Sequence, residues 1–298
     1  MKKFVILGDS TCDLNGELRK KYDIDYAPMR FSIDGEDYEA DLDYKRLTPH
    51  EFYDIMRGGK RIITAQVPAH TFEEKFTEYA KAGEDILYIS CSSGLSASIN
   101  SAKLVADEVM NAYPDCKIVC VDSLCSSMGQ GLLCIIASNL RAEDKTIDEV
   151  AKFIEENRLK ANQECTADKL SYLRQAGRVS AASAFFGGLL NIKPIIISDV
   201  KGRNAAIEKV KGRKNSIDKL VERTVKGYEQ NPYFSDVCVV HADCPEDADI
   251  LCEKLLEALP ITRENIHIGF IGPIVGASAG PGTISTYFFG KEVTYSAD

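Results

Sequence analysis

Residues 85–123 read DILYISCSSGLSASINSAKLVADEVMNAYPDCKIVCVDS. The apolar, β-branched runs at 85–91 and 117–122 predict two strands, and the residues from about 96 to 112 have the apolar spacing of a helix. Strands joined by a helix of this length form right-handed βαβ units, in which the two strands lie parallel. This stretch therefore predicts an α/β fold built on a parallel sheet.

The alternation of strands and helices extends over the first half of the chain. Thr48 with Glu51, and Thr146 with Glu149, form capping-box patterns that predict the starts of two helices. Gly58-Gly59 ends the first of these, and the second runs to about residue 157. The same pattern predicts strands at 4–7 and 26–33 and helices at 13–22, 71–82 and 128–140.

After about residue 160 the pattern changes. Two apolar runs flank a Lys201-Gly202 turn, at 193–199 and 205–210, and predict a hairpin, which belongs to an antiparallel or mixed sheet. Further strands are predicted at 236–241, 265–271 and 284–289, around a helix at 247–259. We therefore expect an N-terminal Rossmann-like α/β lobe over residues 1–159 and a C-terminal α+β lobe with a mixed sheet over residues 160–298.

Composition and charge exclude several classes of protein. The chain has 298 residues, 45% of them hydrophobic, with 36 Lys and Arg against 45 Asp and Glu. A net charge of -9 without a dense basic block makes nucleic acid a poor partner. No apolar run approaches the roughly 20 residues of a membrane span. The first apolar run stops at Gly8-Asp9, too early for a signal peptide, so we expect a cytoplasmic protein.

The cysteines and histidines do not form a metal-binding pattern. Ten cysteines in a chain without an export signal predict reduced thiols, and no C-x-x-C occurs. The four histidines are scattered, at His50, His70, His241 and His267. Because the phosphate-binding P-loop and the dinucleotide-binding glycine motif are also missing, we expect neither a metal nor a cofactor.

Hydroxyl and acidic residues follow three of the predicted strands, at 8–13, 90–96 and 121–123. The carboxyl ends of parallel strands lie at one edge of a sheet, where open α/β sheets bind their ligands, so these clusters should converge. Ser92, Ser93 and Ser96 surround Gly94 just before a helix, where backbone N–H groups favour an anion. For any single serine, helix capping alone explains the position equally well.

Two other segments are candidates for the same site. Thr64-Ala65-Gln66 is predicted to lie in a loop, where its polar side chains either satisfy loop backbone or face a ligand. Arg174 and Arg178 lie on either side of a predicted helix end at Gly177. The apolar segment 181–190 that follows forms either core or the wall of an apolar pocket.

Gly276-Ala277-Ser278-Ala279-Gly280 matches the G-x-S-x-G nucleophile elbow of serine hydrolases. The elbow needs a following helix and a later histidine, but Pro281-Gly282-Thr283 comes next and no histidine occurs after His267. We therefore interpret the segment as a glycine-rich loop with N–H groups exposed to a ligand. A hydrolase or transferase with Ser96 or Ser278 as nucleophile stays as an alternative that lacks a base.

Six motifs occur in order over almost the whole chain. They are Asp9-Ser10-Thr11-Cys12-Asp13, Thr64-Ala65-Gln66, Ser92-Ser93-Gly94-Leu95-Ser96, Val121-Asp122-Ser123, Gly177-Arg178-Val179-Ser180 followed by Leu190-Asn191-Ile192-Lys193-Pro194, and Gly280-Pro281-Gly282. In this set and order the chain resembles the DegV family. The resemblance implies a two-lobe bacterial protein that encloses one long-chain fatty acid, about C14 to C18, between its lobes.

The resemblance also implies a role and a set of site residues. Family members are the non-catalytic, acyl-binding subunit of a fatty acid kinase: a separate ATP-binding subunit phosphorylates the bound carboxyl group, giving an acyl phosphate for phospholipid synthesis. Thr64 and Ser96 would bind the fatty-acid carboxylate. The supporting polar network would consist of Ser92, Ser93, Gln66, Arg178 and Ser278. Transient membrane contact would serve lipid exchange.

Three departures from the family pattern bear on that role. Ala65 and Val67 replace the usual Ser and Pro, and Ala97-Ser98 replaces Gly-Thr after the closing serine. Ser278 stands where many relatives carry a histidine, a change that would affect partner docking or phosphoryl transfer. A stand-alone lipid-binding or regulatory protein without a kinase partner is therefore the alternative function.

Overall fold

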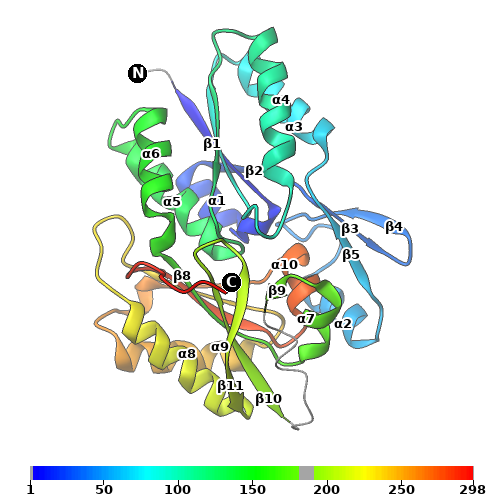
Figure 1. Cartoon of the computed structure of the whole chain (residues 1–298), viewed down its shortest axis with the longest axis vertical. Coiled ribbons are helices and arrows are strands. Elements are labelled where there is room, and N and C mark those ends of the chain that lie inside the picture. Colours follow the sequence, from blue (N-terminus) through cyan, green and yellow to red (C-terminus); the bar gives the residue numbers. More distant parts are fainter. Residues whose placement is uncertain (1–2, 181–190, 298) are drawn as a thin grey trace.

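The computed structural model describes residues 3–180 and 191–297. It contains a parallel sheet from the first half of the chain and a larger mixed sheet from the second half, with helices around both (Figure 1). The predicted α/β fold with a second, mixed-sheet lobe is confirmed. The apolar segment at 181–190, predicted as core or pocket wall, lies outside the described residues.

The parallel sheet has the strand order β2-β1-β6-β7. Its strands are β1 (Phe4–Asp9), β2 (Ile24–Ala27), β6 (Asp85–Ser90) and β7 (Ile118–Asp122). Helices α3 (Ala69–Lys81) and α4 (Ser98–Ala112) pack on one side, and α1 (Gly16–Tyr22), α5 (Met128–Ala142) and α6 (Ile147–Asn157) on the other (Figure 1). Every residue of β6 is buried, because helices cover both faces of the strand.

Two predicted elements of this half are wrong in extent. The strand expected at 26–33 is two strands in different sheets, because Pro28 cannot donate to a ladder and the N–H of Met29 donates to Ser10 Oγ at 2.9 Å. The helix expected from residue 13 begins at Gly16: Asp13 has a left-handed φ of 52°, and Asn15 is the N-cap.

A small antiparallel sheet extends from the parallel sheet. Its order is β4-β3-β5, from β3 (Arg30–Ile33), β4 (Glu36–Glu39) and β5 (Ile62–Ala65), with α2 (Pro49–Arg57) between β4 and β5 in the chain. Thr64, expected in a loop, is instead in β5, where it pairs with Phe31. A polar strand of four residues has little apolar pattern, which is why β4 was not predicted.

The mixed sheet has the order β13-β12-β14-β8-β10-β11-β9. Its strands are β8 (Ala161–Thr166), β9 (Val179–Ser180), β10 (Ile192–Ser198), β11 (Asn204–Lys211), β12 (Val237–His241), β13 (Ile266–Phe270) and β14 (Ile284–Phe289). Its helices are α7 (Leu170–Ala176), α8 (Arg213–Gly227), α9 (Pro245–Ala258) and α10 (Pro273–Ala279). Strands β10 and β11 form the predicted hairpin around Lys201-Gly202.

Helix α5 joins the two sheets. It contacts β1 and β6 of the parallel sheet and also β8 and β14 of the mixed sheet, and twelve of its fifteen residues are buried. The predicted helix at 128–140 is apolar on almost every face, and a helix of that kind has to be buried on all sides. At Gly131 a methyl group would lie 2.5 Å from the carbonyl oxygen of Cys12, so glycine lets the helix approach the loop after β1. No helix in the described ranges combines the length and apolar character of a membrane span.

A buried carboxyl group connects the loop after β1 to α10. The hydroxyl of Ser127 donates to Asp13 Oδ2 at 2.5 Å, and the N–H of Gly272 donates to Oδ1 at 3.0 Å. Burial raises the pKa of Asp13 from 3.8 to about 8, with the nearby Asp9 carboxylate acting in the same direction. Below about pH 8, Asp13 is therefore mainly protonated in the folded state.

This pKa gives stability a pH dependence of known sign. Because the folded pKa lies above the unfolded one, the contribution is complete below about pH 4 and is lost as pH rises through about 8. Asp13→Asn removes the charge but keeps a hydrogen-bonding side chain: its oxygen can accept from the N–H of Gly272, and its NH2 group can donate to Ser127 Oγ. Between about pH 6 and pH 9 we expect the wild type to lose about 3 kcal/mol more of its free energy of unfolding than the variant. Urea denaturation at both pH values measures this, and equal losses would contradict the assignment.

Candidate functional site

The loops after β1, β6 and β7 meet at the carboxyl edge of the parallel sheet, as the sequence predicts. The buried carboxylate of Asp9 accepts hydrogen bonds from Thr11 Oγ1 at 2.6 Å, Tyr88 OH at 2.9 Å and the N–H of Cys91 at 2.8 Å. The N–H of Ser93 donates to Asp122 Oδ1 at 3.1 Å. Asp9 and Asp122 thus fix the loop 90–96 between its two neighbours.

A cavity of about 250 Å³ opens beside these loops. It brings together five of the seven residues expected at the site: Thr64, Gln66, Ser96, Arg178 and Ser278. Its other lining residues are Thr11, Met29, Ala65, Cys91, Leu95, Ala97, Ser126, Asn204, Ile274 and Val275. The lining therefore combines residues from all three sheets or the loops next to them, and it contains both polar and apolar residues.

Ser96 lies two residues before the start of α4. Its Oγ accepts a hydrogen bond from the N–H of Ser98 at 3.3 Å and lies 3.0 Å from Ser98 Oγ. Ser98 Oγ in turn accepts from the N–H of Val67 at 3.2 Å. The buried Ser98 thus ties the segment after Thr64 to the start of α4, and positions Thr64 and Ser96 relative to each other.

Arg178 lies between α7 and β9. Gly177, with a φ of 63°, ends α7, so that the chain turns and brings Arg178 to the cavity. Its Nη1 donates to the carbonyl oxygen of Ala176 at 2.8 Å, and the residue is exposed. Over residues 3–180 and 191–297 no carboxylate forms an ion pair with Arg178. The guanidinium is therefore a positive charge available to an anionic ligand.

Ser92 and Ser93 lie outside the cavity lining. Ser92 is buried, and its Oγ accepts from the N–H of Gly94 at 3.1 Å. Ser93 is exposed and holds Asp122 through its backbone. A methyl group on Gly94 would lie 2.8 Å from the carbonyl oxygen of Lys201, so this loop rests directly on the β10–β11 turn. The hydrogen bonds of Ser92 and Ser93 therefore stabilise the conformation of the loop that carries Ser96.

Residues 276–279 are helical and Gly280 is the C-cap of the same helix, which corrects the expected glycine-rich loop. Pro273 occupies the first turn of α10, and the N–H groups of Gly276 and Gly280 donate to the carbonyl oxygens of Gly272 and Gly276. These N–H groups are used within the helix and are not free for a ligand. Ser278 lines the cavity from the last turn of α10.

Among the described residues that line the cavity, none is placed as the base that a serine or cysteine nucleophile requires. None of its described lining residues is a histidine. Burial raises the pKa of the Cys91 thiol well above its usual value, so the thiol stays protonated. The geometry suits binding of an anion better than nucleophilic catalysis.

Ser126 and Asn204 were not identified from the sequence. Ser126 follows the predicted cluster 121–123 by three residues, and a wider window after the strand would have included it. Asn204 begins β11 and reaches the cavity only because β11 pairs with β9 next to Arg178. No local pattern marks such a residue.

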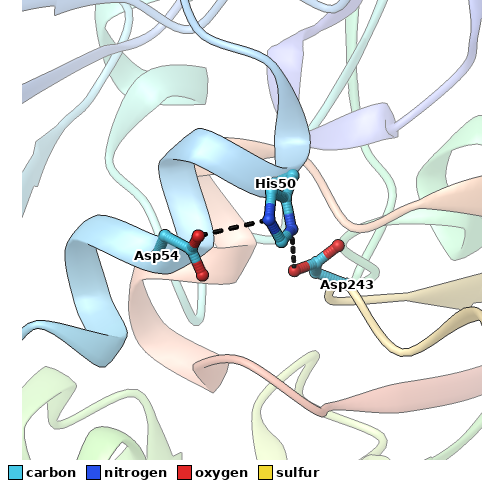
Figure 2. A group of neighbouring side chains, drawn as sticks. All are labelled: His50, Asp54 and Asp243. Atoms are coloured by element: carbon cyan, nitrogen blue, oxygen red, sulfur yellow. Dashed lines mark hydrogen bonds and ion pairs between the residues drawn. The ribbon is translucent and has the colours of Figure 1, made fainter.

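A separate group of polar side chains joins α2 to the residues after β12. His50 Nδ1 lies 2.9 Å from Asp243 Oδ2, and His50 Nε2 lies 3.2 Å from Asp54 Oδ2 (Figure 2). Arg57 Nη1 contacts the same two carboxylates, at 2.7 Å from Asp54 Oδ1 and 2.5 Å from Asp243 Oδ2. The hydrogen bond with Asp243 raises the pKa of His50. His50, Asp54 and Asp243 are close enough together to be metal ligands. Because the guanidinium of Arg57 already compensates the charge of the two carboxylates, we interpret the group as an ion-pair network.

Comparison with known proteins shows the DegV family. The family model described as "Uncharacterised protein, DegV family" matches residues 3–291. A DegV domain-containing protein of Clostridium perfringens is 38% identical over 290 residues, which cover 97% of this chain and 98% of the relative. One of Streptococcus pyogenes is 32% identical over 291 residues, covering 97% and 98%.

Solved structures agree over the whole fold. A DegV lipid binding protein from Thermotoga maritima superposes with a TM-score of 0.84 at 27% identity, covering 98% of this chain and all of the other. A second protein from Thermotoga maritima, whose structure reveals fatty acid binding function, has a TM-score of 0.83 at 26% identity, with the same coverage. The two-lobe arrangement is therefore shared.

Proposed function

Because this chain belongs to the DegV family, we propose that it binds one long-chain fatty acid, of about C14 to C18, and presents the carboxylate to a separate ATP-dependent fatty acid kinase subunit for acyl phosphate formation. Thr64 and Ser96 bind the carboxylate in this proposal, and Gln66, Arg178 and Ser278 support it. Residues 1–159 supply the loops around the carboxylate, and residues 160–298 enclose the acyl tail. The protein itself is non-catalytic and cytoplasmic.

The observation that carries the proposal is the composition of the 250 Å³ cavity. Thr64, Ser96 and Arg178 line one space, and no carboxylate of residues 3–180 and 191–297 forms an ion pair with Arg178. Hydroxyl donors and a guanidinium are the groups that hold a carboxylate with charge-assisted hydrogen bonds. Gln66 and Arg178 are exposed, so a partner protein can reach a carboxylate bound here.

An apolar path for the acyl tail leads away from these groups. Met29, Leu95, Ile274 and Val275 line the main cavity. A smaller cavity of about 40 Å³ shares Ser126, Arg178, Asn204, Val275 and Ser278 with it and continues toward Leu173, Ile196 and Ile271. Since each buried methylene contributes about 0.8 kcal/mol, the tail would supply most of the affinity and the polar groups would fix its orientation.

Mass spectrometry of an organic extract from the purified protein tests this function. We expect one fatty acid of C14 to C18 per chain. Protein that is empty, and that also fails to take up added palmitate or oleate, would contradict the binding role. Loaded protein that forms no acyl phosphate with ATP and a fatty acid kinase subunit would contradict the presenting role alone and favour a stand-alone lipid-binding protein.

A further inference from the structure

A second cavity, of about 200 Å³, adjoins the first. Thr64, Arg178 and Ser278 line both cavities, so the two spaces meet at the residues to which we assign the carboxylate. Beyond this junction the second cavity is bounded by Lys60 and Arg61, just before β5, and by residues of α7. Polar surface predominates in it, which makes it unsuitable for an acyl tail.

The charges around the second cavity are all positive. Lys60, Arg61 and Arg178 line it, and none of its described lining residues carries a carboxylate. Lys60 is partly neutralised by Asp34, at 2.7 Å, whereas no carboxylate in the described part of the chain pairs with Arg61 or Arg178. In a chain with a net charge of -9, two guanidinium groups at one cavity that have no acidic partner among the described residues favour an anionic ligand.

We propose that the second cavity is a phosphate subsite, in which Arg61 and Arg178 bind a phosphate group beside the fatty-acid carboxylate. Guanidinium groups bind phosphate oxygens in a bidentate manner, and two of them match its two negative charges. If Thr64 binds the carboxyl group, a phosphate attached to one of the carboxyl oxygens would lie next to the second cavity, because Thr64 lines both cavities. This inference rests on the proposed function and adds to it the recognition of the phosphorylated product by this chain.

Three probes separate the sources of the phosphate: hexadecanoic acid, hexadecyl phosphate and inorganic phosphate. Hexadecyl phosphate has a methylene where an acyl phosphate has its carbonyl group, so its phosphorus lies at the same position along the chain. We expect Arg61→Gln to weaken the binding of hexadecyl phosphate about tenfold or more, and to change the Kd of hexadecanoic acid by less than about twofold. Isothermal titration calorimetry measures all three.

Two further variants serve as controls. Lys81→Gln removes an exposed positive charge that lines neither cavity, and it should change the binding of none of the probes. Arg61→Lys keeps the charge without the bidentate geometry and should give an intermediate loss. If inorganic phosphate also binds and loses affinity in Arg61→Gln, free phosphate is a ligand of the subsite; if only hexadecyl phosphate responds, the lipid phosphate is.

The outcomes distinguish this inference from the proposed function. An Arg61→Gln protein that binds all three probes as the wild type does would overturn the phosphate subsite and leave fatty-acid binding intact. Equal weakening of hexadecanoic acid and hexadecyl phosphate would also overturn it, since Arg61 would then act on the carboxylate. If the wild type binds neither lipid, fatty-acid binding fails, and the response of inorganic phosphate to Arg61→Gln alone decides the subsite.

Discussion

Thr64→Val combined with Ser96→Ala is expected to remove about 100-fold or more of the preference for hexadecanoic acid over hexadecanol. Each hydroxyl would donate one hydrogen bond to a charged carboxylate, and such bonds contribute about 1.5–3 kcal/mol each. The alcohol, which carries no charge, gains far less from the same two groups. Competition with a fluorescent fatty acid measures the Kd of each lipid for the wild type and for the double variant. The ratio of the two Kd values gives the acid preference of each protein.

Thr64→Val and Ser96→Ala, made as single variants, should keep their bound lipid but no longer hold its carboxylate in a fixed orientation. The acyl tail supplies most of the affinity, so we expect each single variant to be purified with bound fatty acid but to support phosphoryl transfer poorly. Ser93→Ala is the matched control, because Ser93 is an exposed serine of the same loop that does not line the cavity. Lipid-free protein from both single variants would contradict this order of effects, and an unchanged acid preference would refute the carboxylate site.

Gly280→Ala is expected to destabilise the protein by about 2–6 kcal/mol. Gly280 ends α10 with φ 83° and ψ 165°, a conformation that is essentially restricted to glycine and costs other residues about 1–3 kcal/mol. A methyl group there would overlap the ring of Tyr172 and lie 2.9 Å from its Cβ, and such crowding costs about 1–3 kcal/mol more. Because Tyr172 belongs to α7, the substitution would also disturb the helix that leads to Arg178.

Gly59→Ala provides the comparison that isolates the crowding. Gly59 also has a positive φ, of 87°, but a methyl group there meets no atom within 4 Å. We expect this variant to lose only about 1 kcal/mol, the cost of the backbone conformation alone. Urea denaturation of both variants measures the difference. Equal losses would show that α7 and α10 can separate without cost and that the Tyr172 contact is unimportant.

Much of the fold follows from local patterns. The strand–helix–strand pattern of residues 85–123 predicts β6, α4 and β7 within a few residues, because buried parallel strands and amphipathic helices have distinct apolar periods. The capping boxes at Thr48 and Thr146 predict α2 and α6, because each cap is made by residues three apart. These features depend only on neighbours in the chain.

Other features depend on contacts between distant residues, and local patterns predict them wrongly. The segment Gly276–Gly280 suggests a loop, yet it forms the end of α10, because Pro273 starts a helix there and Tyr172 packs against its last glycine. The run at 26–33 suggests one strand, yet it divides at Pro28 between two sheets. In each case a proline marks the change locally, and a contact with a distant residue, Tyr172 at Gly280 and Ser10 at Met29, stabilises the observed conformation.

The candidate site shows the same division. The sequence by itself determined which residue types were available: the hydroxyls of Thr64 and Ser96, the arginine after Gly177, and a family resemblance that runs through all of them. Only the tertiary structure decided that Asn204 and Ser126 join them, that Ser92 and Ser93 do not, and that a second, positively charged cavity meets the first at Arg178. The physical reason is that strand ends are ordered by hydrogen bonding within each sheet, whereas a cavity is formed by the side chains that remain between two sheets after they pack.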